Sequence, residues 1–172
     1  IIESGGKQFG AAHSALAAKE FIDSNEPLLV TNCDQIMKWN SNIFKFCAGE
    51  ADGKIVLFKS DSDRNSYAKI KDDGYVGEIA EKIVISNDAL VGIHYWKHGK
   101  DFVSSAEMLI KELNGSREAY ISETYNYLIK EGKKIFPYII SSSGYISLGT
   151  PSLVTDYLGN DSWIAENIYA SV

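Results

Sequence analysis

The chain has few cysteines and prolines, no membrane-length apolar run and no cluster of basic residues. Its two cysteines, Cys33 and Cys47, have neither metal-ligand nor redox spacing, which favours a reduced, cytoplasmic setting. No run approaches the roughly 18 apolar residues that a membrane span requires. The chain has 17 basic and 23 acidic residues, and the basic ones are scattered. We therefore expect neither a membrane nor duplex nucleic acid as a partner.

Length and composition fit one globular domain. The 172 residues are 45% apolar, which is normal for a protein with a packed core. A net charge of −6 still allows a small anionic ligand, because a phosphate site needs local geometry rather than overall positive charge. Residues 1–6 read as the end of a strand, so we expect the chain to begin inside a larger fold.

The hydrophobic pattern alternates helices with strands. Helices are expected over residues 10–22, 39–48, 104–113 and 122–130, and a last helix opens at Thr150, its N-cap, with Pro151 in the first position. Strands are expected over residues 28–31, 54–59, 66–70, 75–81, 90–96, 134–140 and 145–148. The third and fourth strands form a hairpin around Asp72-Asp73-Gly74. This order predicts an α/β fold with a mixed sheet.

The most informative segment is LLVTNCDQ, from Leu28 to Gln35. Its apolar run is typical of a strand covered on both faces, and we expect Asp34 at the end of this central strand, open to a pocket. Ligands of open α/β sheets bind outside the carboxyl ends of strands. A carboxylate there is well placed to hold a hard cation against phosphate oxygens. Asn and Asp also end strands because they make good turns, so the segment alone leaves both interpretations open.

Five short motifs resemble those of a known family in their order and spacing. They are Gln8-Phe9-Gly10-Ala11-Ala12-His13-Ser14-Ala15-Leu16, Asn32-Cys33-Asp34-Gln35, Glu81-Lys82, Val91-Gly92-Ile93 and Leu148-Gly149-Thr150-Pro151. From about residue 8 to residue 157 the chain resembles the sugar-phosphate nucleotidyltransferases, also called nucleoside-diphosphate-sugar pyrophosphorylases. The motifs look most like those of variants found with bacterial capsule and surface-polysaccharide genes. Each motif is short, but five in order are considerably more specific.

The resemblance implies a Rossmann-like mixed sheet sandwiched by helices, with its first strand missing. It implies a nucleotidyltransferase domain over residues 1–158 and a C-terminal tail over residues 159–172. The implied reaction joins a nucleoside triphosphate to a sugar 1-phosphate, or a related phosphate, and releases pyrophosphate. Mg²⁺ is the implied cofactor, and catalysis of the in-line attack rests mostly on positioning and charge neutralisation. A homo-oligomer is compatible with this interpretation.

On the nucleotide side the resemblance singles out three residues. Gln8 and Gly10 match the family's base-binding loop, where a Gln side chain and a glycine backbone read the edge of the nucleobase. Asp34 matches the catalytic carboxylate that binds Mg²⁺ and, through it, the phosphates. Without the resemblance, Gly10 would simply precede a helix and Gln8 would be solvated.

On the sugar side the resemblance singles out Glu81 and Lys82. Glu81 would accept hydrogen bonds from sugar hydroxyls, and Lys82 would neutralise the phosphate as a catalytic group. An ordinary surface ion pair at a strand end is the alternative. Tyr67 and Gly92 would line the same pocket. His94 falls where a pocket aromatic is common, and it equally fits a strand histidine with satisfied hydrogen bonds.

Two departures from the family pattern bear on catalysis. Ser147 stands where the family commonly has an Asp as a second metal ligand, which puts coordination through two carboxylates in doubt. The family's glycine-rich loop, with its Arg and a following Lys, belongs to the first strand and helix, and nothing before Gln8 supplies it. We therefore expect the 172-residue chain alone to be inactive.

The departures keep two other functions open. One is a non-catalytic nucleotide-sugar binding or regulatory module of the same fold. The other is a glycosyltransferase of similar architecture, which would need an Asp-x-Asp motif after a strand. Asp34 has no acidic partner at Ile36, and the pair Asp61 and Asp63 lies in a loop rich in Ser and Asp.

Overall fold

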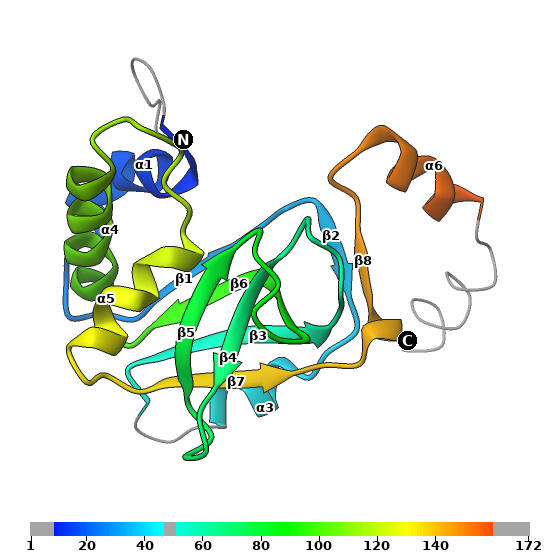
Figure 1. Ribbon diagram of the computed structural model, residues 1–172, viewed down its shortest axis with the longest axis horizontal. Helices are drawn as coiled ribbons and strands as arrows, with labels where there is room; N and C mark the ends of the chain where they lie inside the picture. The colour runs from blue at the N-terminus through cyan, green and yellow to red at the C-terminus, as the bar shows by residue number, and fades with distance from the viewer. Residues whose placement is uncertain (1–8, 47–50, 160–172) are drawn as a thin grey trace.

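The structure is a computed structural model that describes residues 9–46 and 51–159 (Figure 1). Its centre is a six-stranded sheet of order β5-β4-β6-β3-β7, in which β1 also pairs with β6. The strands are β1 (Leu28–Thr31), β3 (Gly53–Lys59), β4 (Ser66–Ile70), β5 (Val76–Glu81), β6 (Asp88–Trp96) and β7 (Ile135–Ile139). The β3–β7 pair is parallel and the other described pairs are antiparallel, which confirms the mixed sheet.

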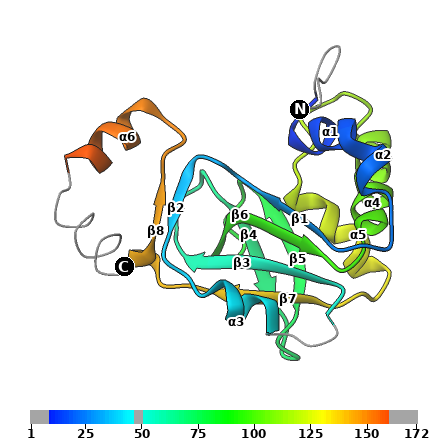
Figure 2. The ribbon, with the colours of Figure 1, turned by 180° about the vertical axis from the view of Figure 1, so that it is seen from behind.

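Helices flank the sheet on both faces, as the sequence predicts. One group gathers over one face (Figures 1 and 2): α1 (Ala11–Ala15), η1 (Leu16–Ala18), α2 (Lys19–Ile22), α4 (Gly99–Leu113), η2 (Ser122–Thr124) and α5 (Tyr125–Lys130). The first three together occupy the helix expected over residues 10–22. On the other face lies α3 (Ser41–Phe46). Its first turn is capped by the Asn40 side chain, which accepts from the backbone N–H of Asn42 at 3.0 Å and of Ile43 at 3.1 Å.

Two apolar clusters form the core, one on each face of the sheet. Successive side chains of a strand point to opposite faces. Ile55 of β3 therefore packs toward α4 and α5, and its neighbour Val56 packs toward α3. In the first cluster the rings of Trp96 and Tyr125 stack at 4.7 Å between centroids. Burying a large apolar side chain of this kind contributes about 2–3 kcal/mol to stability.

A second, two-stranded sheet was not expected from the sequence. In it β2 (Gln35–Met37) pairs antiparallel with β8 (Tyr145–Ser147), which follows the turn η3 (Ser142–Gly144) and precedes α6 (Pro151–Leu158). As predicted, Thr150 caps α6: its hydroxyl accepts from the N–H of Leu153 at 3.3 Å. This small sheet sets the turn after β1 beside the turn after β8 (Figure 1).

The structure corrects the expectation that residues 28–31 form a central strand covered on both faces. Among the described residues β1 pairs only with β6. Its side chains alternate between half-buried and exposed, and Leu29 is 53% exposed. The outer edge of β1 has no partner in the described part of the chain, so its pairing with a strand upstream of residue 1 stays a prediction.

The helix expected over residues 104–113 begins earlier, at Gly99. The first turn of a helix leaves backbone N–H groups without helical partners. Here the carbonyl of Glu26 accepts from Gly99 at 2.8 Å and the carbonyl of Ser24 accepts from Lys100 at 3.0 Å. The loop after α2 thus caps α4 from a distance in sequence. None of the helices in the described ranges is both long and apolar enough to cross a bilayer.

Candidate functional site

A polar cleft of about 260 Å³ opens where β4, β5 and β6 meet η2 and the turn after β1. Two of the residues singled out by the sequence, Glu81 and Gly92, line it. The full lining is Ala11, Asn32, Arg64, Asn65, Ser66, Glu81, Leu90, Val91, Gly92, His94, Tyr120, Ile121, Ser122, Tyr145 and Ser147. We call Ser66, Glu81, Gly92, His94 and Ser122 the strand wall. Asp34 and Gly149, on the turns next to it, and Ser147, at the end of the strand before the second turn, form the turn edge.

Glu81 is held by two serines of the strand wall. It ends β5 directly opposite Ser66 of β4, and its Oε2 accepts hydrogen bonds from the hydroxyls of Ser66 and of Ser122, the latter at 3.1 Å. The other oxygen, Oε1, has no hydrogen-bond partner among the described residues. The carboxylate is therefore fixed in place with one acceptor oxygen left for a ligand.

Gly92 is required by the way the turn after β1 rests on β6. Its φ is +74°, and a Cβ built there would lie 2.3 Å from Nδ2 of Asn32. The backbone N–H of Asn32 also donates to the Gly92 carbonyl at 3.0 Å. A Cβ at this position would displace the exposed Asn32 side chain from the cleft, and the positive φ by itself favours glycine.

Asp34 lies on the turn edge, three residues after β1 ends, and it is exposed. Its carbonyl accepts from the N–H of Leu148 at 2.8 Å, and a Cβ on Gly149 would come within 3.0 Å of its Oδ2. Burial raises the pKa of the Tyr145 phenol; a hydrogen bond with Ser147 lowers this pKa and the charge of Asp34 raises it. Since Tyr145 and Ser147 line the cleft, the Asp34 carboxylate stands at its margin.

The turn edge fits a Mg²⁺ ion that is coordinated mainly by the phosphate oxygens of a bound ligand. Mg²⁺ commonly takes one or two carboxylates, with phosphate oxygens and water completing its shell. Asp34 supplies one such exposed carboxylate. Within the described residues no group of three or more His, Cys, Asp or Glu side chains gathers as a metal site. Ser147 lies opposite Gln35 in the β2–β8 pair. As a serine it brings a hydroxyl to the turn edge and not a second carboxylate.

Lys82 lies beside the cleft rather than in it. It lines a neighbouring hollow of about 580 Å³ that shares Glu81 and Tyr120 with the cleft. Its Nζ donates to the Tyr120 hydroxyl at 2.9 Å, and this bond raises the pKa of Lys82. Its φ of +54° is rare for a residue with a side chain, and it turns the chain at the end of β5.

Arg117 lines the same hollow as Lys82, and the sequence reasoning missed it. Its guanidinium makes a two-pronged bond to the Glu123 carboxylate, at 2.8 and 2.7 Å. The two residues are six positions apart across a loop and the start of η2, a spacing that matches no local pairing rule. The only sequence signal was a pair of opposite charges flanking the loop.

Two other predicted site residues, Tyr67 and Gly10, lie elsewhere. Tyr67 is fully buried among core side chains and its hydroxyl donates to the Ser62 carbonyl at 2.7 Å, so it does not line the cleft as expected. Gly10 is the N-cap residue of α1, and a Cβ there would lie 2.5 Å from the Ala119 carbonyl oxygen. Gln8 lies outside the described residues. The roles of Gly10 and Gln8 in base binding stay predictions.

His94 is a buried polar residue of the strand wall, 6% exposed. Its ring stacks on Trp96 and Tyr125, with centroid distances of 6.0 and 5.9 Å. Burial lowers the pKa of His94 from 6.5 to about 4, so the imidazole is neutral at neutral pH. Its Nδ1 is buried without a hydrogen-bond partner among the described residues. This differs from the expectation of a strand histidine with satisfied hydrogen bonds.

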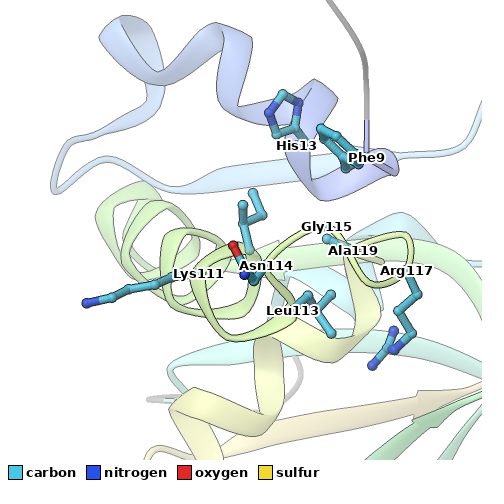
Figure 3. A pocket seen from close by; sticks show the side chains of 9 residues that line it. Phe9, His13, Lys111, Leu113, Asn114, Gly115, Arg117 and Ala119 are labelled. Carbon is cyan, nitrogen blue, oxygen red and sulfur yellow. The ribbon is translucent and has the colours of Figure 1, made fainter.

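A second hollow, of about 410 Å³, lies between α1 and the end of α4 (Figure 3). Phe9 and His13 stand on one side of it, and Leu113, Asn114 and Gly115 on the other. Its lining contains no carboxylate and none of the residues to which the sequence assigned a catalytic or binding role. A small polar ligand would find few acceptors there, so the smaller cleft is the better candidate site.

The fold is shared with solved structures of nucleotidyltransferases. A nucleoside-diphosphate-sugar pyrophosphorylase from Vibrio cholerae RC9 is 24% identical, with a TM-score of 0.74 over 90% of this chain. A Bacillus anthracis protein described as a glucose-1-phosphate thymidylyltransferase is 23% identical, with a TM-score of 0.68 over 91% of this chain. The inositol-1-phosphate CTP transferase of T. maritima is 14% identical, with a TM-score of 0.68 over 94% of this chain.

The chain has the nucleotidyltransferase fold. It spans 66%, 63% and 64%, respectively, of the lengths of these three proteins. Neither a protein-family model nor a curated protein sequence matches it. The likeness therefore establishes the fold, and the chemistry must be argued from the cleft.

Proposed function

We propose that this chain belongs to an enzyme that joins a nucleoside triphosphate to a sugar 1-phosphate, or a related polyol phosphate, and releases pyrophosphate. The product would be a nucleotide-activated sugar for surface polysaccharide synthesis. The observation that carries this proposal is the polar cleft of a nucleotidyltransferase fold, in which Glu81 and Gly92 lie on the strand wall and Asp34 stands at the turn edge.

The strand wall suits the sugar. The free Oε1 of Glu81 accepts hydrogen bonds from sugar hydroxyls, and the hydroxyls of Ser66 and Ser122 keep the carboxylate oriented. Lys82 and Arg117, in the adjoining hollow, provide positive charge for the sugar's phosphate. Each is already paired inside the protein, Lys82 with Tyr120 and Arg117 with Glu123, which limits its freedom before the ligand arrives.

The turn edge suits the triphosphate. Asp34 would hold the Mg²⁺, which when bound neutralises phosphate charge. A phosphate oxygen of the sugar phosphate attacks the α-phosphorus of the nucleotide in line, and the bond from that phosphorus to the β-phosphate's bridging oxygen breaks. Pyrophosphate leaves with the electron pair. In this proposal the loop of Gln8 and Gly10 reads the nucleobase.

A second candidate is a non-catalytic module that binds nucleotide-sugars without turning them over. The observation in its favour is Ser147, which brings no second carboxylate to the turn edge. A glycine-rich loop with Arg and Lys encoded directly before residue 1 would favour the enzyme. Its absence from the natural protein would favour the binding module.

A thermal-shift panel tests the proposal, because a ligand that binds the native state raises its apparent stability. We expect a sugar 1-phosphate, and a nucleoside triphosphate with Mg²⁺, each to raise the melting temperature of the chain. No shift with any member of either class would refute the proposal. In the same preparation we expect no pyrophosphate release, and robust release would show that the chain contains its own triphosphate cradle.

A further inference from the structure

The segment over residues 117–123 contacts both Glu81 and Lys82, the adjacent residues where β5 ends. Its Ser122 donates to the carboxylate of Glu81 at 3.1 Å, and the hydroxyl of its Tyr120 accepts from Nζ of Lys82 at 2.9 Å. Tyr120 lines the cleft as well as the neighbouring hollow, so it stands on the border between them. One segment thus holds the acceptor of the strand wall and the cation beside it.

The hydrogen bonds around Tyr120 run in one direction. Its hydroxyl donates to Oε2 of Glu118 at 2.8 Å. A phenol has one proton and an ionised carboxylate can only accept, so the phenol oxygen is left to accept from Lys82. An ammonium has three N–H donors, and Tyr120 takes one of them. Nζ of Lys82 has no second hydrogen-bond partner in the described part of the chain, which leaves two donors for a ligand.

The bond to Tyr120 orders a side chain that would otherwise be mobile. Lys82 is exposed, and the long stem of a free lysine samples many rotamers. Ordering such a side chain when the ligand binds costs affinity, and ordering it beforehand avoids this cost. The hydrogen bond with Tyr120 also raises the pKa of Lys82, as expected for a contact that favours the ammonium form.

We propose that Tyr120 is a positioning residue, whose hydroxyl, oriented by Glu118, holds the ammonium of Lys82 at the border of the cleft for the phosphate of a sugar or polyol phosphate. The inference rests on the proposed function and deepens it. Glu81 accepts from the hydroxyls of the ligand, and Lys82 follows it directly in the chain. A sugar 1-phosphate can reach both, because its phosphate is attached to the ring that carries the hydroxyls.

Substitutions at both ends of the Tyr120 hydroxyl separate hydrogen bonding from charge and packing. Tyr120→Phe removes the hydroxyl and keeps the ring. Glu118→Ala and Glu118→Gln remove the same charge, but only glutamine keeps an oxygen that accepts from Tyr120. Tyr127→Phe is the matched control, because Tyr127 lines neither the cleft nor the hollow of Lys82. Its hydroxyl also donates to a glutamate, Glu112 at 2.6 Å, and Nζ of Lys130 lies 5.3 Å from its ring centroid.

The experiment is isothermal titration of the purified chain and its variants with glucose 1-phosphate, with an unfolding curve recorded for each variant. We expect Tyr120→Phe to bind roughly three- to tenfold more weakly than wild type, and Tyr127→Phe to bind like wild type. Glu118→Ala should bind more weakly than Glu118→Gln. Because Tyr120 acts through Lys82, adding Tyr120→Phe to Lys82→Ala should cause no further loss. In the ligand-free protein, carbon-13 NMR of the lysine side chains should show a lower pKa of Lys82 in Tyr120→Phe than in wild type.

The outcomes separate this inference from the proposed function. Wild-type binding that Tyr120→Phe leaves unchanged overturns the role of Tyr120 and leaves the proposed function standing. Additive losses from Tyr120→Phe and Lys82→Ala, equal affinities of the two Glu118 variants, or an unchanged pKa of Lys82 also overturn it. Failure of the wild-type chain to bind glucose 1-phosphate counts against the proposed function for this ligand, and the inference falls with it. If Tyr120→Phe is unstable, the two Glu118 variants decide, because Glu118 is exposed.

Discussion

The strand wall lines the cleft and the turn edge borders it, and the two are built in different ways. Glu81, Gly92 and His94 stand on strands backed by the core, and their side chains or backbones are held by neighbours. Asp34 and Gly149 are exposed on turns, and the main support of the turn edge is the short pairing of β2 with β8. In the proposed function the wall is pre-organised for the sugar, whereas the edge would become a site only together with bound phosphates.

This difference has a physical reason. Sugar hydroxyls are uncharged, so their recognition depends on donors and acceptors fixed before binding. Phosphate oxygens and a hard cation attract each other strongly. Their binding needs fewer pre-positioned protein groups, because phosphate and water supply most of the ligands of the ion. A single exposed carboxylate, that of Asp34, would then be enough to position the cation. The comparison predicts that damage to the wall affects both stability and binding, and that damage to the edge affects binding alone.

The largest expected effect is that of Gly92→Ala. The positive φ costs about 1–2 kcal/mol for a residue with a Cβ, and the new Cβ would displace Asn32. We expect a loss of about 3 kcal/mol in the free energy of unfolding, measured by urea denaturation. Gly74→Ala is the control: its φ is +82° but a Cβ at that position would have no neighbouring atom within 4 Å, so it should lose only the backbone part. Equal losses in the two variants would contradict the close contact of Gly92 with Asn32.

The second effect concerns acid stability. The pKa of His94 falls from 6.5 in the unfolded chain to about 4 in the fold. The folded protein thus resists protonation, and this contribution is complete above pH 6.5 and is lost as pH falls toward 4. The loss is about 3 kcal/mol. Carboxylates titrate in the same range, so the measurement is the difference between wild type and His94→Gln in unfolding curves from pH 7 to pH 4. Parallel pH profiles would show that His94 is not buried as described.

The third effect isolates the turn edge. Asp34→Asn should weaken Mg²⁺-dependent binding of a nucleoside triphosphate by at least tenfold, about 1.4 kcal/mol, because the ion loses its carboxylate. Binding of sugar 1-phosphate and the unfolding free energy should stay near wild type, since the side chain is exposed. Asp72→Asn, in the hairpin turn, is the matched control. Mg²⁺-dependent binding that survives Asp34→Asn would refute the metal assignment.

The smallest expected effect is that of Lys82→Ala. Lys82 is exposed and borders the cleft, so its charge acts partly through water. We expect sugar-phosphate affinity to fall by roughly three- to tenfold, with little change for the triphosphate. Lys130 is the matched control, because its Nζ lies 5.3 Å from the centroid of the Tyr127 ring as that of Lys82 lies 5.0 Å from the Tyr120 ring. Lys130→Ala should leave both affinities unchanged. A larger effect of Lys82→Ala on the triphosphate would place Lys82 on the other side of the site.

Local signals in the sequence predicted much of this fold. The turn Asp72-Asp73-Gly74 predicted the position of the hairpin, and Thr150 before Pro151 predicted the start of α6, because these residues act on the backbone directly around them. The position of Glu81 at the end of β5 also followed from local pattern. Of its two partners, Ser66 can be inferred from the hairpin register, but Ser122 cannot, because it is 41 residues away.

What the sequence could not show depends on contacts between distant segments. The pairing of β2 with β8 rests on three residues in each strand, too short for a periodic signal. The early start of α4 depends on carbonyls from the loop after α2. Tyr67 was predicted to line the pocket, and a tyrosine suits such a position. Only the packing of the second core cluster shows that its side chain is buried in the core.

The most direct test of the central claim is to map both ligands on one labelled sample by backbone amide NMR. Glucose 1-phosphate should shift amides of the strand wall, around Ser66, Glu81, Gly92 and Ser122. A nucleoside triphosphate with Mg²⁺, added next, should shift residues 32–35 and 147–150 of the turn edge. Shifts centred instead on Phe9 and Leu113, in the hollow of Figure 3, would contradict the assignment of the cleft as the site.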